Sequence, residues 1–279
     1  MGCLQKLSSD DKDQLLDYLK QNEFDTTLII GNVKQFGIDN DKNIRRCGDY
    51  YGYIENHKLQ GVIAFYNLGN CITHYESINS IQYFSDIIKE KNVNNLLGMS
   101  KYILPLYEKI KDYKKIKEFS NYSYLVNKNF KSYRSKDAVV VSSESVNIDA
   151  AIEFIIEANK IGFSKELTQE EAFKTIKERS AEEEEVFVVR DGKIAAKASI
   201  LGCTDNVCQI GGVYTAAEYR GNGYCKASVS ELCRRAIKRG KIPSLMVRKD
   251  NFPAIKAYTS LGFEHYEDNI IISFNYAKE

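Results

Sequence analysis

The residues with the clearest chemical potential lie in one stretch, from Gly212 to Cys225, which reads Gly-Val-Tyr-Thr-Ala-Ala-Glu-Tyr-Arg-Gly-Asn-Gly-Tyr-Cys. This pattern is typical of an apolar strand, a glycine turn and the start of a helix. The first backbone N–H groups of a helix have no partner within it and lie at the positive end of its dipole. Gly221 and Gly223 allow a tight bend and the close approach of a ligand, and Arg220 adds a positive charge. The combination predicts that the turn binds a phosphate or a pyrophosphate.

The spacing within this turn excludes two common phosphate loops. The Walker pattern, which needs Gly, four residues and then Gly-Lys-Ser/Thr, does not occur here, and the dinucleotide pattern needs a third glycine where the chain has Lys226. The pattern that remains is Arg-x-x-Gly-x-small, with Cys225 as the small residue. A second run follows downstream, Asn-x-x-Ala-x-x-x-Tyr-x-x-x-Gly-Phe, from Asn251 to Phe263.

Together, and in this order, the two runs resemble the acetyl-CoA signatures of the GNAT superfamily of N-acetyltransferases, with a closer likeness to its FR47-like members. The family usually has Gly or Ala at the position of Cys225, and Cys is only slightly larger. The resemblance covers roughly the last half of the chain, and it implies acetyl-CoA as the coenzyme. The residues that it implies as coenzyme contacts are Val213, Tyr214, Thr215, Arg220, Gly221, Asn222, Gly223, Tyr224, Cys225 and Asn251.

Acetyl transfer to an amine requires a polarised thioester, a neutral amine and a proton for the departing thiolate. In the family, backbone N–H groups of the strand before the loop polarise the acetyl carbonyl, and the resemblance carries this role over to Val213, with Thr215 as its main-chain neighbour. Tyr258 resembles the family's general acid, and the reference pKa values of phenol and thiol, about 10 and about 8.5, are nearly matched. Tyr258 and Asn251 each also have a purely structural alternative, in which Tyr258 only packs on a helix face and Asn251 only caps a helix.

The sequence assigns no general base. Glu218 lies beside the loop, and Glu166, Glu170 and Glu171 lie between two expected helices, where the family shapes its acceptor site. The acidic run from Glu182 to Glu185 is typical of a solvated surface, although it could attract a cationic amine. Many members of the family pass the proton through water instead.

Helical and strand periodicities indicate the elements that position these residues. Helices are expected after the two motifs, where Lys238, Arg239 and Gly240 end the first and Gly262 ends the second. Asp191-Gly192 predicts a hairpin turn between two strands. The expected strands of the second half are 138–141, 186–189, 194–201, 208–214, 244–247 and 270–274, and its expected helices are 147–160, 169–179, the one after the loop and 253–261.

The first half repeats this order of elements, which predicts a tandem duplication. Its equivalent of the loop, Glu76-Ser77-Ile78-Asn79-Ser80, contains neither glycine nor a basic residue. We therefore expect an α+β protein with two GNAT-like domains, each a mostly antiparallel sheet flanked by helices. Residues 1–130 would form a degenerate domain without a coenzyme site, serving as a wall of the substrate cleft or a packing partner, and residues 131–279 would form the acetyltransferase domain, with the boundary near 127–135.

Composition narrows the partners and the compartment. A net charge of +1 gives no general attraction to nucleic acid or anionic membranes, so neither is an expected partner. The first twenty residues contain Asp10, Asp11 and Asp17 and no apolar core, so a signal peptide is not expected. The seven cysteines are odd in number and form no C-x-x-C, which predicts reduced thiols in the cytoplasm, and no zinc spacing with histidine occurs, so no metal is expected.

The favoured function is therefore an acetyl-CoA-dependent N-acetyltransferase that transfers the acetyl group directly to an amine in a ternary complex. The acceptor, a small molecule or a peptide, is not identified by the sequence. Two alternatives remain: an acyl-CoA-binding sensor without turnover, and a transferase of a longer acyl or an aminoacyl group.

Overall fold

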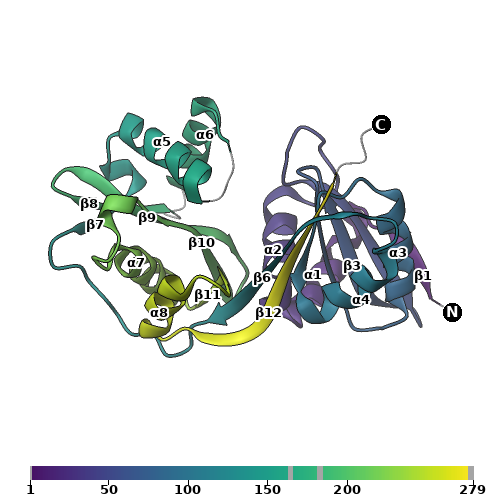
Figure 1. Ribbon diagram of the computed structural model, residues 1–279. Helices are drawn as coiled ribbons and strands as arrows, with labels where there is room; N and C mark the ends of the chain where they lie inside the picture. The colour runs from purple at the N-terminus through teal and green to yellow at the C-terminus, as the bar shows by residue number, and fades with distance from the viewer. Residues whose placement is uncertain (1, 163–165, 181–184, 276–279) are drawn as a thin grey trace. The chain divides into compact units, whose positions relative to one another are not determined.

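The computed structural model describes residues 2–162, 166–180 and 185–275. The chain divides into two compact units, Met1–Tyr124 with Tyr266–Glu279 and Leu125–His265. In both, the elements follow one order: a strand, two helices, three strands, a helix, a strand and a helix (Figure 1). This repeated order confirms the expected fold class, a mixed α and β protein in which each unit has a mainly antiparallel sheet flanked by helices.

The first unit is built on a sheet with the strand order β1-β2-β3-β4-β5-β12. Its strands are β1 (Cys3–Lys6), β2 (Gly48–Glu55), β3 (Lys58–Tyr66), β4 (Asn70–Tyr75), β5 (Asn95–Met99) and β12 (Glu264–Phe274). Only β4 and β5 run parallel among these neighbours. The hairpin of β2 and β3 turns through Asn56 and His57, both with positive φ. The first of the two chain segments that make up this unit ends within β6 (Ile116–Val126).

Helices cover both faces of this sheet, because alternate residues along the central strands are apolar on both sides. The helices are α1 (Lys12–Lys20), preceded by the short η1 (Ser9–Asp11), α2 (Glu23–Phe36), α3 (Ser80–Glu90) and α4 (Ser100–Ile110). Val62 and Ala64 of β3 pack against α1 and α2 in one buried cluster. Ile63 and Phe65 belong to a second cluster with α3 and α4. Two cores thus hold a three-layer unit together.

The last strand of the chain differs from its expected place. The sequence predicts that residues 270–274 close the second domain, but Asn269–Ser273 pair antiparallel with Asn95–Met99 of β5. The side chains of Ile270, Ile272 and Phe274 are buried in the core between the sheet and α3 and α4. The second unit therefore ends at His265. An alternating apolar strand fits any sheet with a free edge, so its pattern alone does not reveal which sheet it joins.

A histidine lies in the interior of the first unit. His74 on β4 is 1% exposed, and its Nδ1 lies 2.8 Å from the hydroxyl oxygen of Tyr18 on α1. Burial lowers the pKa of His74 to about 4, although nearby Asp25 acts in the opposite direction. The folded chain therefore holds this imidazole neutral, whereas an unfolded chain protonates it near pH 6.5.

This shift predicts a pH-dependent loss of stability. Between about pH 6.5 and pH 4 the unfolded chain binds a proton at His74 that the folded chain does not, so the free energy of unfolding falls as the pH falls. Between these pH values we expect the free energy of unfolding of the wild type to fall by about 3 kcal/mol more than that of His74→Gln, as measured by urea denaturation. His57→Gln, at an exposed turn residue, should retain the wild-type pH profile. Parallel profiles for wild type and His74→Gln would contradict the prediction.

The second unit is built on a sheet with the strand order β11-β10-β9-β8-β7. Its strands are β7 (Val139–Ser142), β8 (Glu185–Arg190), β9 (Lys193–Cys203), β10 (Val207–Thr215) and β11 (Ile242–Arg248). β10 and β11 run parallel, and the other neighbours are antiparallel. Asp191 and Gly192 form the turn between β8 and β9 with positive φ, as expected.

The helices of this unit also lie on both faces of the sheet (Figure 1). They are α5 (Ile148–Glu157), followed by a π-helical segment (Ala158–Gly162), α6 (Gln169–Ser180), α7 (Tyr224–Lys238) and α8 (Phe252–Ser260), with short turns η2 (Ser143–Ser145) and η4 (Ala217–Tyr219). Leu232 and Tyr258 belong to the core between the sheet and α7 and α8. Phe154 and Tyr214 belong to the core beneath α5 and α6.

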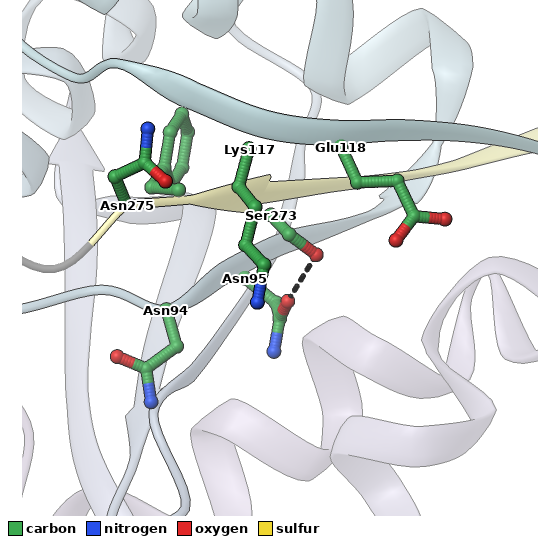
Figure 2. A pocket seen from close by; sticks show the side chains of 7 residues that line it. Asn94, Asn95, Lys117, Glu118, Ser273 and Asn275 are labelled. Atoms are coloured by element: carbon green, nitrogen blue, oxygen red, sulfur yellow. Dashed lines mark hydrogen bonds between the residues drawn. The ribbon is translucent and has the colours of Figure 1, made fainter. Parts of the chain in front are cut away.

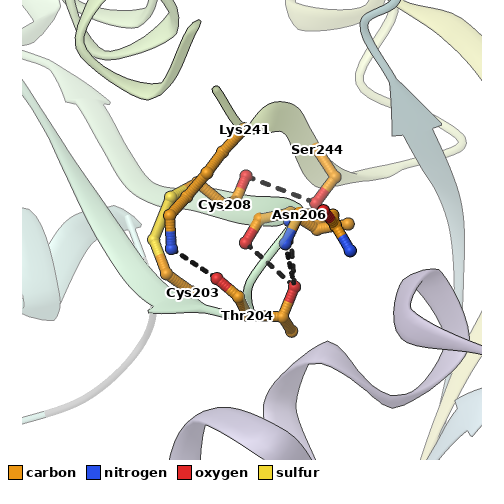
Figure 3. The surroundings of a disulfide bond; sticks show 7 residues. Cys203, Thr204, Asn206, Cys208, Lys241 and Ser244 are labelled. Carbon is orange, nitrogen blue, oxygen red and sulfur yellow. Dashed lines mark hydrogen bonds between the residues drawn. A yellow bond between two sulfur atoms is a disulfide. The ribbon is translucent and has the colours of Figure 1, made fainter. Parts of the chain in front are cut away.

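Two cysteines correct the expectation of reduced thiols. Cys203 at the end of β9 and Cys208 on β10 face each other in register and form a disulfide (Figure 3). The Thr204 hydroxyl accepts the backbone N–H of Val207 at 2.9 Å, which tightens the turn between the two strands. This turn brings the cysteines together although their spacing matches no familiar motif. Cys3, Cys47, Cys71, Cys225 and Cys233 remain thiols.

Among the helices within the described ranges, none combines the length and the apolar character that crossing a membrane requires.

Candidate functional site

The turn between β10 and α7 has the backbone that the sequence predicts. Gly221 and Gly223 have φ values of 83° and 80°, which residues other than glycine rarely adopt. The amide nitrogen of Ala227 donates to the carbonyl of Gly223 at 3.0 Å. The amides of Tyr224 to Lys226 precede this bond, so the helix offers them no acceptor. They form the positive N-terminal end of a 15-residue helix.

Two side chains fix the course of this turn. The Asn222 amide donates to the carbonyls of Tyr219 at 3.1 Å and Arg220 at 3.3 Å. The guanidinium of Arg220, which is exposed, donates from Nε to the carbonyl of Thr215 at 3.3 Å. The hydroxyl of Thr215 is buried and has no hydrogen-bond partner within the described residues. The turn is thus ordered from within, and Arg220 holds its charge beside it.

The surroundings of the two glycines differ. A Cβ atom on Gly221 would meet no atom of the described part of the chain within 4 Å, so open space lies over this part of the turn. A Cβ on Gly223 would lie 2.4 Å from the hydroxyl oxygen of Tyr133. The Nζ atom of Lys226 lies 4.2 Å from the centroid of the Tyr133 ring. A phenol and an ammonium group therefore border the turn in addition to Arg220.

Sequence reasoning missed both Tyr133 and Lys226. Tyr133 comes from the segment that connects β6 to β7, far from the motif in sequence, so no local pattern links it to the turn. Lys226 does follow the motif directly, and a cation at the third position of a helix predicted to bind phosphate was a usable signal.

Tyr224 contributes to the turn through its backbone. Its side chain is 1% exposed and packs with Val188 and Ala227. Its hydroxyl accepts from Arg190 at 2.9 Å and donates to Asp137 at 3.0 Å. The ring is committed to the interior of the unit, so a ligand at the turn would meet only the backbone N–H of this residue.

The strands that lead into the turn separate before they end. Val207–Ile210 of β10 pair with Ile242–Leu245 of β11, and each strand continues beyond this pairing. On the other edge, Gly211 faces Ser199 and Tyr214 faces Lys197, so three steps along β10 match two along β9. This bulge contains Gly212, with a φ of 58°, and Val213. Val213, which the sequence marks as an oxyanion donor, therefore lies where the regular pairing of β10 is interrupted.

Tyr258 and Cys225, predicted from separate motifs, are brought into contact. The hydroxyl of Tyr258 on α8 and the thiol of Cys225 in the first turn of α7 interact electrostatically, and both residues belong to the same core cluster. Burial raises the pKa of Tyr258 well above its usual value of 10, and the adjacent thiol raises it further. Burial also raises the pKa of Cys225 to about 11. The phenol is thus held protonated at neutral pH beside a sulfur atom.

Asn251 has the capping geometry that the sequence predicts. Its side-chain oxygen accepts the backbone N–H of Ala254 at 3.2 Å, and the residue is exposed. The cap fixes the start of the helix that carries Tyr258. A contact between Asn251 and the coenzyme stays a prediction.

The carboxylates considered in the search for a general base differ in their exposure to solvent. Glu166, Glu170, Glu171 and Glu218 are exposed. Glu182–Glu184 lie outside the described residues. Glu185 is 0% exposed and its Oε1 lies 2.8 Å from the Nζ atom of Lys197, so the expectation of a solvated surface is wrong for this residue.

The structure adds one carboxylate that the sequence analysis missed. The hydroxyl of Tyr214, on β10 directly after the bulge, donates to the carboxylate of Glu157 at 3.0 Å. Glu157 ends α5 and is exposed, and the π-helical segment starts at the next residue. Such segments often occur at functional sites, which was not readable from the sequence.

Two surface hollows lie elsewhere. One, of about 340 Å³, belongs to the first unit and lies at the Asn95 end of β5, where Ser273 donates to Asn95 at 2.7 Å (Figure 2). The other follows α7 from Glu231 to Arg239, on the C-terminal half of that helix. Neither is lined by the predicted site residues.

Comparisons with known proteins agree with this geometry. Residues 152–263 match the model of the acetyltransferase (GNAT) family. The chain is similar to a GNAT-family acetyltransferase from Colwellia psychrerythraea, with a TM-score of 0.62 and 18% identity. The alignment covers 98% of this chain and 100% of the Colwellia chain. A Drosophila protein aligns over 98% of both chains with a TM-score of 0.73 and 10% identity.

A third structure bears on the repeated architecture. A tandem GNAT protein from the clavulanic acid biosynthesis pathway aligns over 100% of both chains with a TM-score of 0.57 and 11% identity. At such identities the likeness shows the fold alone, and no curated protein sequence matches the chain. The family model, in contrast, covers both motifs and the strands and helices that carry them. The chain therefore has the fold of tandem GNAT proteins, and its second unit carries a domain of the GNAT acetyltransferase family, whose fold supports acetyl transfer from acyl-CoA.

Proposed function

We propose that the second unit transfers an acetyl group from acetyl-CoA directly to an amine in a ternary complex. The observation that carries this proposal is the open space over Gly221, at a glycine turn that begins α7 and follows the point where β10 has left β11. A diphosphate fits such a turn because unpaired amides, the helix dipole and Arg220 all favour negative charge there.

The binding residues would act mainly through the backbone. The amides of Gly221 to Cys225 bind the pyrophosphate, Arg220 neutralises part of its charge, and Asn251 contacts the pantetheine end. Val213 to Thr215 line the gap that opens as β10 separates from β11. Lys226 and the phenol of Tyr133 add two donors at the same turn.

The chemical step would need two further actions from the chain. Acetyl-CoA, when bound, supplies an acetyl group activated as a thioester. The N–H of Val213 stabilises the negative charge that develops on the acetyl oxygen as the amine nitrogen attacks the carbonyl carbon. Tyr258 gives its proton to the sulfur as the carbon–sulfur bond breaks. The amine enters neutral and loses one proton to water or to a carboxylate such as Glu157, and a proton from water then restores the phenol of Tyr258.

The first unit would have no coenzyme site. At the start of α3, its counterpart of α7, the carboxylate of Glu55 accepts from the Ser77 hydroxyl and from the Asn79 amide, each at 2.8 Å. A negative side chain thus lies where an anionic ligand would have to bind, and the preceding turn has no glycine. We propose that this unit serves as a packing partner or shapes the substrate cleft.

We also propose a small-molecule or peptide amine as the acceptor, and neither nucleic acid nor a membrane as a partner, consistent with a net charge of +1. A cytoplasmic location stays a prediction. A sensor without turnover and a transferase of a longer acyl group remain alternatives, and donor length can be compared with acetyl-, succinyl- and longer acyl-CoA.

Isothermal titration calorimetry with acetyl-CoA tests the proposal first. We expect saturable binding to one site per chain, because only the second unit has the glycine turn. No heat of binding at millimolar ligand would remove the proposal, and two sites per chain would contradict the assignment of the first unit. Release of thiol from acetyl-CoA across an amine panel then separates the enzyme from a sensor, which would bind without turnover.

A further inference from the structure

A charged cluster lies inside the second unit and takes no part in the reaction described above. Glu185 on β8 and Lys197 on β9 form an ion pair of 2.8 Å, with side chains 0% and 5% exposed. The Ser199 hydroxyl donates to Oε1 of Glu185 at 2.8 Å and lies 3.0 Å from the Nζ atom of Lys197. Removing two charges from water costs several kcal/mol per ion, so a buried pair of this kind rarely increases stability.

The cluster lies directly against the bulge of β10. The Nζ atom of Lys197 donates to the carbonyl oxygen of Gly212 at 3.4 Å. A Cβ atom on Gly212 would lie 3.3 Å from Oγ of Ser199 and 3.5 Å from Nζ of Lys197. The absence of a side chain at Gly212 therefore lets the ammonium group approach the backbone at this one place.

Peptide geometry carries the effect of this contact to the next residue. The carbonyl of Gly212 and the N–H of Val213 belong to the same planar trans peptide and point in opposite directions. An ammonium group that holds the carbonyl oxygen therefore turns the N–H of Val213 away from Lys197. A positive charge at the oxygen also draws electron density from the nitrogen, which makes the N–H a stronger donor.

We propose that Lys197, held by Glu185 and Ser199, is a positioning residue that orients and polarises the Val213 N–H toward the acetyl oxygen of the bound thioester. The inference rests on the proposed function, because it names what tunes the oxyanion donor of that site. Glu185 balances the charge of Lys197 and fixes its long side chain in one place. The bulge releases the Val213 N–H from the regular strand pairing, and the ion pair fixes the direction in which this N–H points.

The test uses the double variant Glu185→Leu/Lys197→Met, which replaces the pair by apolar side chains of similar volume. Such replacements are often neutral or stabilising, whereas either single variant leaves an uncompensated buried charge. The probe is acetyl-CoA labelled with carbon-13 at the acetyl carbonyl, observed by NMR on the full chain without acceptor. If binding polarises the acetyl carbonyl, its carbon-13 resonance moves downfield. We expect the double variant to bind the probe with an affinity within about threefold of the wild type but to lose most of the downfield shift.

Turnover gives the second readout, with any amine that the acceptor panel identifies. Removing an oxyanion donor outright costs about 100- to 1000-fold in kcat, and loss of its polarisation alone should cost about tenfold. The KM for acetyl-CoA should change little, a separation that general loosening of the unit would not produce. Glu231→Gln, which breaks the two ion pairs of Glu231 with Arg234 and Arg235 on α7, is the matched control and should keep the wild-type shift and kcat.

The outcomes distinguish a failure of the role of Lys197 from a failure of the proposed function. An equal downfield shift in wild type and double variant, with both bound, overturns the role of Lys197 and leaves the proposed function intact. A wild type that shows no saturable change with labelled acetyl-CoA overturns the proposed function itself.

Discussion

Gly221→Ala is expected to weaken acetyl-CoA binding about 10- to 100-fold in calorimetry while the chain stays folded. A hydrogen bond to a charged group contributes about 1.5–3 kcal/mol, and a methyl group on this residue would project into the open space where the pyrophosphate is proposed to bind. No atom of the described residues lies within 4 Å of that methyl group, so the change adds no clash with them. Its positive φ of 83° makes alanine strained by about 1–2 kcal/mol.

Gly240→Ala controls for that strain. Gly240 follows α7, has a φ of 71°, and likewise has no atom within 4 Å of an added Cβ. Both variants carry the same methyl group in the same backbone region, at opposite ends of one helix. Gly240→Ala should lose stability similarly and keep wild-type affinity for acetyl-CoA. Equal affinities for the two variants would show that the ligand does not bind over Gly221.

Tyr258→Phe is expected to lower kcat about 100- to 10,000-fold, the usual contribution of general acid catalysis, while the Kd for acetyl-CoA stays within a few-fold of the wild type. The variant removes only the hydroxyl, so the ring still fills its place in the core between α7, α8 and the sheet. The measurement is thiol release with an identified acceptor, paired with calorimetry.

The pH profile adds a second criterion for Tyr258. Because burial holds the pKa of this phenol above 10, the acid stays protonated, and this group should cause no decline in kcat between neutral pH and pH 10. Tyr50→Phe, which removes a buried hydroxyl from the first unit, should leave kcat unchanged. If Tyr258→Phe changes neither turnover nor binding, Tyr258 is a packing residue only.

The site also shows how far a local motif reaches. The glycine turn, the Asn251 cap and the two motif helices were readable because each depends on residues close in sequence. Tyr133, Lys197 and Glu157 were not, because each reaches the site from another strand, helix or connection. Glu185 is the clearest case: its neighbours in sequence indicate a solvated acidic run, whereas its neighbours in space are Lys197 and Ser199.

The order of the elements, its repetition in the two halves, the glycine turn and the resemblance to one enzyme family were all readable from the amino-acid sequence. These features follow from periodicity, glycine placement and capping, which act over a few residues. Three pairings become visible in the folded chain alone: β12 with β5 of the first unit, Cys203 with Cys208, and Tyr258 with Cys225. Such pairings depend on strand register and on which faces meet, and many registers satisfy the same alternation of apolar residues.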